Sequence, residues 1–208
     1  MRIIGGRWSG RKFHPPANIP TRPTTDFAKE AMFNMLDTYY NFDNVKYLDL
    51  FGGTGSLSFE FASRGCTDIT TVERFPKCTQ FINKTISELG IEGMKVLQMD
   101  VFVYIEQCRT KFDIIFAGPP YALETLDTIP DLIFEKEMID GEGWFILEHN
   151  PNHSFEKHPH FWKMKSYGST KFSIFRNEKQ ETKKEINGPK GLEPPLYRDW
   201  ETDRKSVV

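Results

Sequence analysis

A glycine-rich segment of the chain can hold a ligand against bare backbone. Residues 49–55 read Asp-Leu-Phe-Gly-Gly-Thr-Gly and follow an apolar run typical of a β-strand. Glycines placed between a strand and a helix let a ligand approach the main chain closely. The spacing differs from the GxGxxG pattern of dinucleotide-binding proteins, which makes a nicotinamide oxidoreductase a distant alternative. We therefore expect the loop to bind a nucleoside-type ligand of another kind.

Acidic residues close three successive predicted strands. Asp49 lies at the end of the first, Glu73 at the end of the second and Asp100 just after the third. In an open parallel sheet these strand ends share one edge, where ligands bind. Glu73 could accept hydrogen bonds from both hydroxyls of a ribose, and Asp100 could accept one from the exocyclic amine of adenine. The alternative is that each acid caps the following helix, but three acids beside a glycine loop favour the ligand.

The segment Gly118-Pro119-Pro120-Tyr121 follows the fourth predicted strand. Prolines preset the backbone, so that a main-chain carbonyl can point into the cleft, and Tyr121 offers a face on which a base can stack. A base held flat, with its exocyclic amine near a carbonyl, is arranged for methylation at nitrogen. The alternative is a tight turn with a packed ring, and the position after the fourth strand favours the functional interpretation.

The hydrophobic pattern alternates strands and helices from residue 46 onward, which predicts an α/β protein with a mostly parallel sheet and helices on both faces. A helix is expected before this region, after an N-cap within Thr24-Thr25-Asp26. An antiparallel hairpin joined at Gly168-Ser169 is expected at the end. The predicted strands are 46–51, 68–73, 95–99, 112–117, 143–148, 161–167 and 170–175, and the helices after the first four are 57–64, 76–90, 101–108 and 123–134.

The first residues are basic and lead into a proline-rich linker. Residues 2–4 and 11–13 predict two short strands around a glycine-containing loop. Prolines then recur between residues 15 and 23, which excludes a helix interior and predicts a linker pinned over the domain. No acidic residue precedes Asp26, so this segment is either a nucleic-acid-binding extension or a solvated basic arm. Its basic residues are Arg2, Arg7, Arg11, Lys12 and Arg22.

The bulk composition excludes several classes of protein. With 208 residues and 38% hydrophobic content, the chain is long enough for one domain with a substantial core. A net charge of −2 argues against a protein that is basic throughout, although a local patch can still bind nucleic acid. Three cysteines without CxxC spacing fit a reducing cytosol, and no segment resembles a signal peptide or a membrane span. We expect a cytoplasmic protein.

Four histidines lie close together in the sequence, at His149, His153, His158 and His160. Prolines interrupt this stretch, which indicates a surface loop, and no cysteine or carboxylate pattern typical of a metal site accompanies the imidazoles. We therefore expect no metal. The cysteines are expected to be small buried residues rather than nucleophiles.

The C-terminal residues 177–208 are polar, rich in Lys and Glu, and without apolar periodicity. This composition predicts disorder. The last six residues, Asp-Arg-Lys-Ser-Val-Val, resemble a translated sequencing adapter. We therefore expect the natural domain to end soon after Phe175, and the fold prediction excludes this non-native tail.

The order of these motifs resembles that of the RsmD-type 16S ribosomal RNA guanine-N2 methyltransferases. The resemblance runs from Arg2 to Phe175, and the combination is specific where any single piece is not. The matching segments are Arg2–Gly6 with Gly10-Arg11, Arg22–Asp26, Glu30–Asn34, Asp49–Gly55, Val72-Glu73, the Pro-Pro-Tyr turn and Tyr167–Thr170.

This resemblance implies a class I methyltransferase domain over residues 24–176, with a Rossmann-like sheet of seven strands and S-adenosylmethionine as cofactor. It implies that a small N-terminal β-hairpin over residues 1–23 helps to hold 16S ribosomal RNA of the small ribosomal subunit, through Arg2, Arg7, Arg11 and Lys12. We expect a monomer that needs neither metal nor membrane. The residues implied at the cofactor are Arg22, Pro23, Thr24, Asp49, Phe51, Gly52, Gly53, Gly55, Glu73 and Asp100, and those at the target guanine are Gly118, Pro119, Pro120 and Tyr121.

One position departs from the family pattern, which reads Asp-Pro-Pro-Tyr where this chain has Gly118. Glycine keeps the backbone but removes the carboxylate that would accept a hydrogen bond from the target amine. Such a loss typically costs a few kcal/mol, or about a hundredfold in rate. The sequence thus predicts a weakened enzyme. It leaves open an adenine-N6 or other amino methyltransferase, and a non-catalytic RNA-binding assembly factor that has lost the chemistry.

Overall fold

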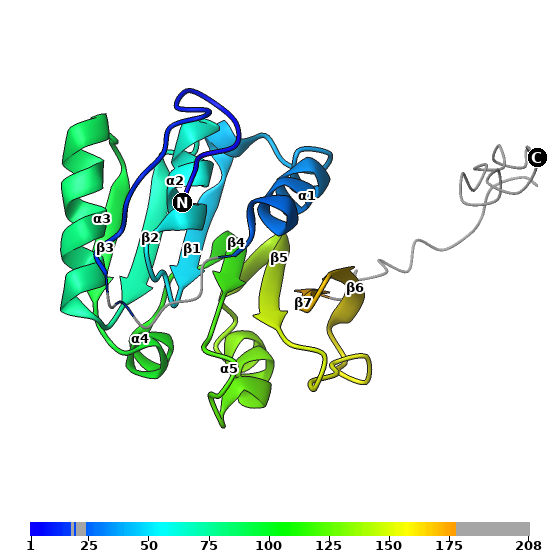
Figure 1. Ribbon diagram of the computed structural model, residues 1–208. Coiled ribbons are helices and arrows are strands. Elements are labelled where there is room, and N and C mark those ends of the chain that lie inside the picture. The colour runs from blue at the N-terminus through cyan, green and yellow to red at the C-terminus, as the bar shows by residue number, and fades with distance from the viewer. Residues whose placement is uncertain (18, 20–23, 178–208) are drawn as a thin grey trace, which may run out of the picture.

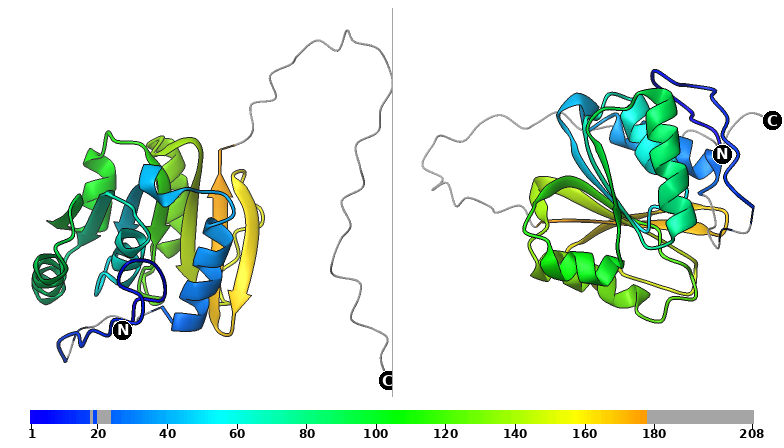
Figure 2. Two further views of the ribbon diagram at one scale, coloured as in Figure 1. Left: turned by 90° about the horizontal axis from the view of Figure 1, so that it is seen from above. Right: turned by 90° about the vertical axis from the view of Figure 1, so that its left-hand side faces the viewer.

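The computed structural model describes residues 1–17, 19 and 24–177 (Figure 1). The predictions for Arg22, Pro23 and the tail from residue 178 onward lie outside the described residues. Asn177 still belongs to the folded domain, because its side-chain amide donates a hydrogen bond to the Gly141 carbonyl at 3.1 Å. One sheet runs through the molecule and carries helices on both faces, as the α/β prediction requires (Figure 2).

The sheet has the strand order β3-β2-β1-β4-β5-β7-β6. The first five strands in that order pair in parallel, whereas β7 pairs antiparallel with both β5 and β6. This arrangement confirms the predicted mostly parallel sheet with a C-terminal antiparallel hairpin. The strands are β1 Lys46–Leu50, β2 Asp68–Glu73, β3 Met94–Gln98, β4 Phe112–Ala117, β5 Ile139–His149, β6 Phe161–Tyr167 and β7 Thr170–Arg176.

Helices cover both faces of the sheet and close two separate hydrophobic cores (Figures 1 and 2). Side chains of β1 alternate between them, so that Tyr47 joins one core and Leu48 the other. None of the described helices has the length and apolar character needed to cross a membrane. The helices are α1 Asp26–Leu36, α2 Ser56–Ser63 and α3 Pro76–Leu89 on one face and α4 Val101–Gln107 and α5 Ile129–Glu135 on the other, with 3₁₀ turns η1 Phe42–Asn44 and η2 Leu126–Thr128.

Local sequence signals set the helix ends. The Thr25 hydroxyl caps α1 by accepting a hydrogen bond from the Ala28 amide at 3.2 Å. Pro76 opens α3, and Gly90 ends it with a φ of 62°, a left-handed conformation that favours glycine. These ends agree closely with the sequence prediction.

Two predicted elements differ from those in the structure. Strand β5 begins at Ile139 rather than at Gly143, because the glycines that predict a break lie in an irregular stretch where the register between β4 and β5 shifts. A Cβ at Gly143 would lie 2.6 Å from the Asp113 carbonyl oxygen, so glycine permits the close approach of the strands there. The helix predicted over 123–134 divides into η2 and α5.

The N-terminal arm, residues 1–17, does not form the two predicted strands. Among the described residues of the arm, the antiparallel pairing is limited to one bridge between Arg2 and Lys12. The amide of Gly5 and that of the residue before it donate instead to the carboxylate of Glu60 in α2, at 2.7 and 2.8 Å. The two ends of the arm are also joined by backbone hydrogen bonds, from the Ile3 amide to the Arg11 carbonyl at 3.0 Å and from the Phe13 amide to the Met1 carbonyl at 2.9 Å. The arm is therefore a hairpin-like loop with a single bridge, anchored on α2 through Glu60.

A buried ion pair lies beneath this anchor. Lys29 Nζ of α1 lies 3.5 Å from Glu60 Oε2, and the two side chains are 1% and 0% exposed. Burial lowers the pKa of Lys29, and the nearby Glu60 carboxylate opposes that effect. The Lys29 ammonium also donates to the Arg2 carbonyl, and Arg64 Nε donates to Glu60 Oε1 at 3.0 Å. Glu60 therefore joins α1, α2 and the arm.

Replacing Glu60 by glutamine should destabilise the protein severely. Glu60→Gln keeps the shape of the side chain but leaves the Lys29 ammonium buried without its counter-charge, which typically costs about 3–5 kcal/mol of unfolding free energy. Urea denaturation measures this quantity. The exposed Glu156 supplies the control, because Glu156→Gln should change stability by less than about 0.5 kcal/mol. Equal stability of the two variants would contradict the role given to Glu60.

Candidate active site

A cavity of about 350 Å³ opens at the carboxyl ends of the parallel strands, the edge at which open α/β sheets bind ligands. The residues that line it come from the loops after β1, β2, β3 and β4, from the end of β5 and from the start of α1. Of the described residues predicted at the cofactor and the base, the cavity brings together all but Gly55: Thr24, Asp49, Phe51, Gly52, Gly53, Glu73, Asp100, Gly118, Pro119, Pro120 and Tyr121.

The loop between β1 and α2 requires glycine at defined positions. Gly53 and Gly55 have φ values of 54° and 75°, in the left-handed region. A Cβ at Gly52 would lie 2.3 Å from Thr71 Cγ2, so close packing against β2 excludes a side chain. Gly55 is the N-cap of α2 and does not line the cavity. Its part in the site is therefore to turn the chain into the helix.

Glu73 is fixed by two backbone donors. The amides of Gly53 and Phe75 donate to Oε2 and Oε1, both at 2.8 Å. The side chain is nearly buried at the cavity wall, and each carboxylate oxygen has a second lone pair with which it can accept a hydrogen bond from a ligand hydroxyl. Glu73 does not cap α3, whose N-cap is Phe75. The capping alternative is therefore wrong for this residue.

Asp49 is a buried acid at the floor of the cavity. Its side chain is almost fully buried and accepts a hydrogen bond from the Ser58 hydroxyl. Burial raises the pKa of Asp49 to about 7, while the Ser58 hydrogen bond opposes the shift. Asp49 caps no helix, because the N-cap of α2 is Gly55. A cationic group bound nearby would favour the ionised form, so the site is suited to a positively charged ligand.

Asp100 caps a helix and also lines the cavity. Its Oδ1 accepts hydrogen bonds from the amides of Phe102 and Val103, at 2.9 and 3.4 Å, so it is the N-cap of α4. Its Oδ2 lies 4.0 Å from an Arg74 Nη atom, and Asp100 and Arg74 both line the cavity. The helix thus fixes one carboxylate oxygen of Asp100 at the wall of the cavity.

The turn after β4 is held at both ends. The Gly118 amide donates to the Leu50 carbonyl at 3.2 Å, which ties the turn to β1, and the Pro120 carbonyl accepts the Leu123 amide at 2.9 Å. The Tyr121 hydroxyl donates to Oε1 of Glu148 at 3.1 Å. Backbone and side chain together therefore fix the position of the tyrosine ring against the cavity.

Glu148 is a site residue that the sequence interpretation missed. It lies in the penultimate position of β5, is 6% exposed and lines the cavity. Its Oε2 accepts a hydrogen bond from the Thr24 hydroxyl at 2.7 Å, while Oε1 accepts one from the Tyr121 hydroxyl, so it connects the segment before α1 to the Pro-Pro-Tyr turn. The signal was present, because an acid at the end of a parallel strand is the same pattern that identifies Asp49 and Glu73.

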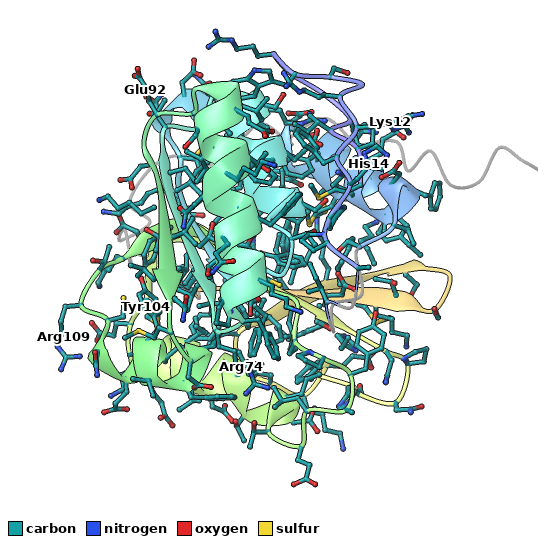
Figure 3. The ribbon with its side chains drawn as sticks, turned by 60° about the vertical axis from the view of Figure 1, so that its left-hand side comes forward. Lys12, His14, Arg74, Glu92, Tyr104 and Arg109 are labelled. Atoms are coloured by element: carbon teal, nitrogen blue, oxygen red, sulfur yellow. The ribbon has the colours of Figure 1, made fainter. Side chains whose placement is uncertain are left out.

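The predicted RNA-binding residues lie on the N-terminal arm. Arg2 pairs with Asp26 at 3.2 Å, with both side chains about half exposed, and Arg7 and Arg11 lie over aromatic rings of the arm itself. Figure 3 labels Lys12 and His14 on the arm and Arg74 near the end at which α3 begins. Positive charge extends from the arm to this helix, although RNA binding stays a prediction. The groove between them is lined by Lys12, His14, Lys77 and Lys84, among others.

The histidines do not share one surface loop, which corrects the sequence interpretation. His149 is fully buried within β5, where its Nε2 lies 2.8 Å from the Ser173 hydroxyl oxygen. His153 and His158 instead pair with exposed aspartates of the segment 127–131. In the described part of the chain no three metal-ligating side chains gather into a potential metal site. The three cysteines are free and buried, as predicted.

A family model described as "Conserved hypothetical protein 95" matches residues 1–176. The chain belongs to the RsmD-type family of class I methyltransferases. A second model, described as a protein of unknown function, matches residues 164–203 and so overlaps β6 and β7.

Relatives of this RsmD-type protein cover most of its length. The Escherichia coli (strain K12) protein named Ribosomal RNA small subunit methyltransferase D is 27% identical over 183 residues, which are 86% of this chain and 91% of that protein. The solved structure of the Escherichia coli protein yhhF has a TM-score of 0.74 at 26% identity, covering 85% of this chain and 97% of that chain. A T. thermophilus 16S rRNA N2 G1207 methyltransferase in complex with AdoMet and guanosine shares the fold, with a TM-score of 0.57 at 20% identity over 74% of this chain and 43% of that chain.

Asp49 should make the stability of the protein depend on pH. Its pKa is about 7 in the folded protein against an ordinary value of 3.8, so the folded state binds the proton more tightly and stability falls as pH rises through this interval. Between about pH 5 and about pH 8, the parent should lose on the order of 2–3 kcal/mol more unfolding free energy than Asp49→Asn. Urea denaturation at the two pH values measures the difference. An equal change of unfolding free energy with pH in the parent and in Asp49→Asn would contradict the raised pKa of Asp49.

Proposed function

We propose that this protein transfers a methyl group from S-adenosylmethionine to the exocyclic N2 of a guanine in small-subunit ribosomal RNA. The observation that carries the proposal is the single cavity lined by both the acid-bearing glycine loop and the Pro-Pro-Tyr turn. The loop suits a nucleoside cofactor, and the turn suits a flat base. The relatives' names support the small subunit and the guanine amine as the target.

The described residues of the glycine loop fit S-adenosylmethionine. Glu73 offers a carboxylate, already oriented by two backbone amides, to the ribose hydroxyls. Asp100 offers its Oδ2 to the adenine amine, and Asp49 is placed to balance the positive charge of the methionine end. When bound, the cofactor supplies an electrophilic methyl group on a positively charged sulfur. Backbone and buried side chains fix these acids before the ligand arrives, which reduces the reorganisation needed on binding.

The turn after β4 would orient the guanine. Tyr121 gives the base a face to stack on, and Glu148 fixes the tilt of that ring through the tyrosine hydroxyl. Because the Pro120 carbonyl is used within the turn, we assign the main-chain acceptor role to the carbonyls of Gly118 and Pro119. A hydrogen bond from the amine to such an acceptor directs its remaining lone pair toward the methyl group. N2 would then bond to the methyl carbon as the bond from that carbon to the cofactor sulfur breaks, S-adenosylhomocysteine would leave, and the proton lost by N2 would pass to water.

The structure has room for the aspartate that the family pattern carries in place of Gly118. Gly118 does not have the left-handed backbone that only glycine adopts readily. A Cβ at this position would lie 3.1 Å from Phe116 Cε1 and 3.8 Å from Cζ. The ring of Phe116 must therefore shift by a few tenths of an ångström to admit a side chain, and the resulting carboxylate would lie beside the cavity.

Gly118→Asp should therefore restore a strong acceptor for the amine. Labelled S-adenosylmethionine and unmodified small ribosomal subunits provide the assay. We expect label on guanine N2 with the parent and about a hundredfold higher rate with Gly118→Asp. Gly118→Ala is the matched control, because it adds the Cβ without the carboxylate and should not accelerate the reaction. A rate for Gly118→Asp no higher than that of the parent would show that the carboxylate is not the missing group.

The same assay decides the proposed function. Label on adenine N6 rather than guanine N2 would favour the alternative of an adenine methyltransferase. Gly118 itself favours a second candidate, a non-catalytic assembly factor that keeps affinity for cofactor and RNA. That candidate predicts that the parent binds the cofactor but releases no S-adenosylhomocysteine. Of the variants, only Gly118→Asp would release it. The cytoplasmic location and the monomeric state stay predictions.

Glu73→Gln tests the cofactor half of the site. An amide has one acceptor oxygen where Glu73 uses two, so one of the backbone donors from Gly53 and Phe75 would meet an N–H₂ group. We expect the Kd for S-adenosylmethionine, measured by calorimetry, to rise at least about tenfold. Glu92→Gln is the control, since Glu92 lies near the end of α3 away from the cavity (Figure 3). Equal affinities of the two variants would refute the ribose-binding role.

A further inference from the structure

An exposed aromatic side chain begins α1 close to the base-binding turn. Phe27 is 70% exposed, more than any other large hydrophobic residue among those described. Its ring meets the Tyr167 ring edge-on, with centroids 5.8 Å apart and an interplanar angle of 81°. Isolated exposed hydrophobic residues are common and by themselves indicate nothing. The position of the Phe27–Tyr167 pair relative to the active site is what indicates a function.

Two chains of contacts connect the Phe27–Tyr167 pair to the active site. Tyr167 pairs with Thr170 across the β6–β7 hairpin, and the Thr170 hydroxyl lies 3.4 Å from the Tyr121 hydroxyl. On the other side, Thr24 precedes α1 and donates to Glu148, the residue that also accepts Tyr121. Figure 2 shows α1 lying along the β6–β7 hairpin. The pair does not itself line the cavity, but these contacts connect it to Tyr121 of the Pro-Pro-Tyr turn from two sides.

The charge around the pair favours a nucleic acid as the group that covers it. The strands β6 and β7, which flank the hairpin turn, contain no acidic residue. Their ionisable cations are Lys163, Lys165, Lys171 and Arg176. Lys165 and Lys171 lie nearest the hairpin turn that carries Tyr167, whereas the acidic neighbours of Phe27 on α1 are Asp26, which pairs with Arg2, and Glu30. An exposed aromatic ring beside lysines is a pattern that binds single-stranded RNA, through base stacking and phosphate contacts. A neutral or basic protein surface would find no complementary charge on this hairpin.

We propose that Phe27 and Tyr167 form a stacking site for a nucleobase of the substrate RNA next to the target guanine. The inference rests on the proposed function. A guanine that reaches the turn at residues 118–121 must leave its stack, and its neighbour thereby loses a stacking partner. An aromatic ring close to the turn replaces that partner, which is worth about 1–3 kcal/mol per base. The pair would select RNA whose target guanine lies in a single-stranded or easily opened segment.

Substitutions at Phe27 separate stacking from hydrophobic packing. Phe27→Leu keeps an apolar side chain but removes the aromatic face, and Phe27→Tyr keeps the face. We expect Phe27→Leu to raise the Kd for unmodified small ribosomal subunits, and the KM in methyl transfer, about tenfold, and Phe27→Tyr to stay within about twofold of the parent. The Kd for S-adenosylmethionine should be unchanged in both. Tyr39→Leu, at another exposed aromatic residue, is the matched control and should behave like the parent.

Three outcomes would overturn the inference. The first is an affinity of Phe27→Leu for subunits equal to that of the parent. The second is an equal loss in the Leu and Tyr variants. The third is a loss confined to assembled subunits and absent with protein-free small-subunit RNA, which would identify a ribosomal protein as the partner. If no variant methylates guanine N2 but Phe27→Leu still weakens RNA binding, the proposed function fails and the stacking site stands.

Discussion

The parallel pairing of β1 with β2 on one side and β4 on the other determines where chemistry can occur in this protein. Leu50 is in register with both Val72 and Ala117, so the three strands end at the same level. Hydrogen bonds from Gly52 to the Val72 carbonyl, and from Gly118 to the Leu50 carbonyl, extend this pairing beyond the strands. The glycine loop and the Pro-Pro-Tyr turn are therefore fixed as neighbours, so that a cofactor bound at the loop would lie beside a base bound at the turn.

Buried carboxylates attach the N-terminal part of the chain to this frame. Glu60 accepts hydrogen bonds from the arm and pairs with Lys29, while Glu148 accepts the Thr24 hydroxyl and the Tyr121 hydroxyl. A buried acid is tolerated only when its oxygens are satisfied, so each carboxylate makes the position of α1 and the arm depend on the domain. The residues around the substrate turn thus come from both ends of the sequence.

Much of the fold could be predicted from the sequence, because its signals are local. Alternating apolar runs identify the parallel strands, and Thr25, Pro76 and Gly90 mark the ends of helices. The two strands predicted in the arm are reduced to one bridge between Arg2 and Lys12, because Glu60 accepts the next backbone amides, those of Ile4 and Gly5. Sequence patterns carry no information about such a long-range competitor. His149 was misplaced for a similar reason, since β5 continues beyond its most apolar stretch to pair with β7.

The candidate site, like the fold, was predictable where the signal is local in sequence and not where it depends on distant residues. Acids at strand ends and the glycine loop could be identified from residue type and spacing, and the structure brings them to one cavity. Gly55 belongs to the motif but lies behind the cavity wall, because the third glycine turns the chain into α2. Glu148 carries the same strand-end signal as Asp49 and Glu73, but its partners, Thr24 and Tyr121, are distant in sequence, and only the folded sheet shows that one carboxylate connects them.

The central claim is that cofactor and target base share this one cavity, with the acids on the cofactor and the turn on the base. A crystal structure with S-adenosylhomocysteine and guanosine bound tests it most directly. The account predicts the ribose against Glu73, the guanine ring on Tyr121, and the guanine N2 directed toward the sulfur. A cofactor bound away from Glu73, or a guanine bound away from residues 118–121, would contradict it.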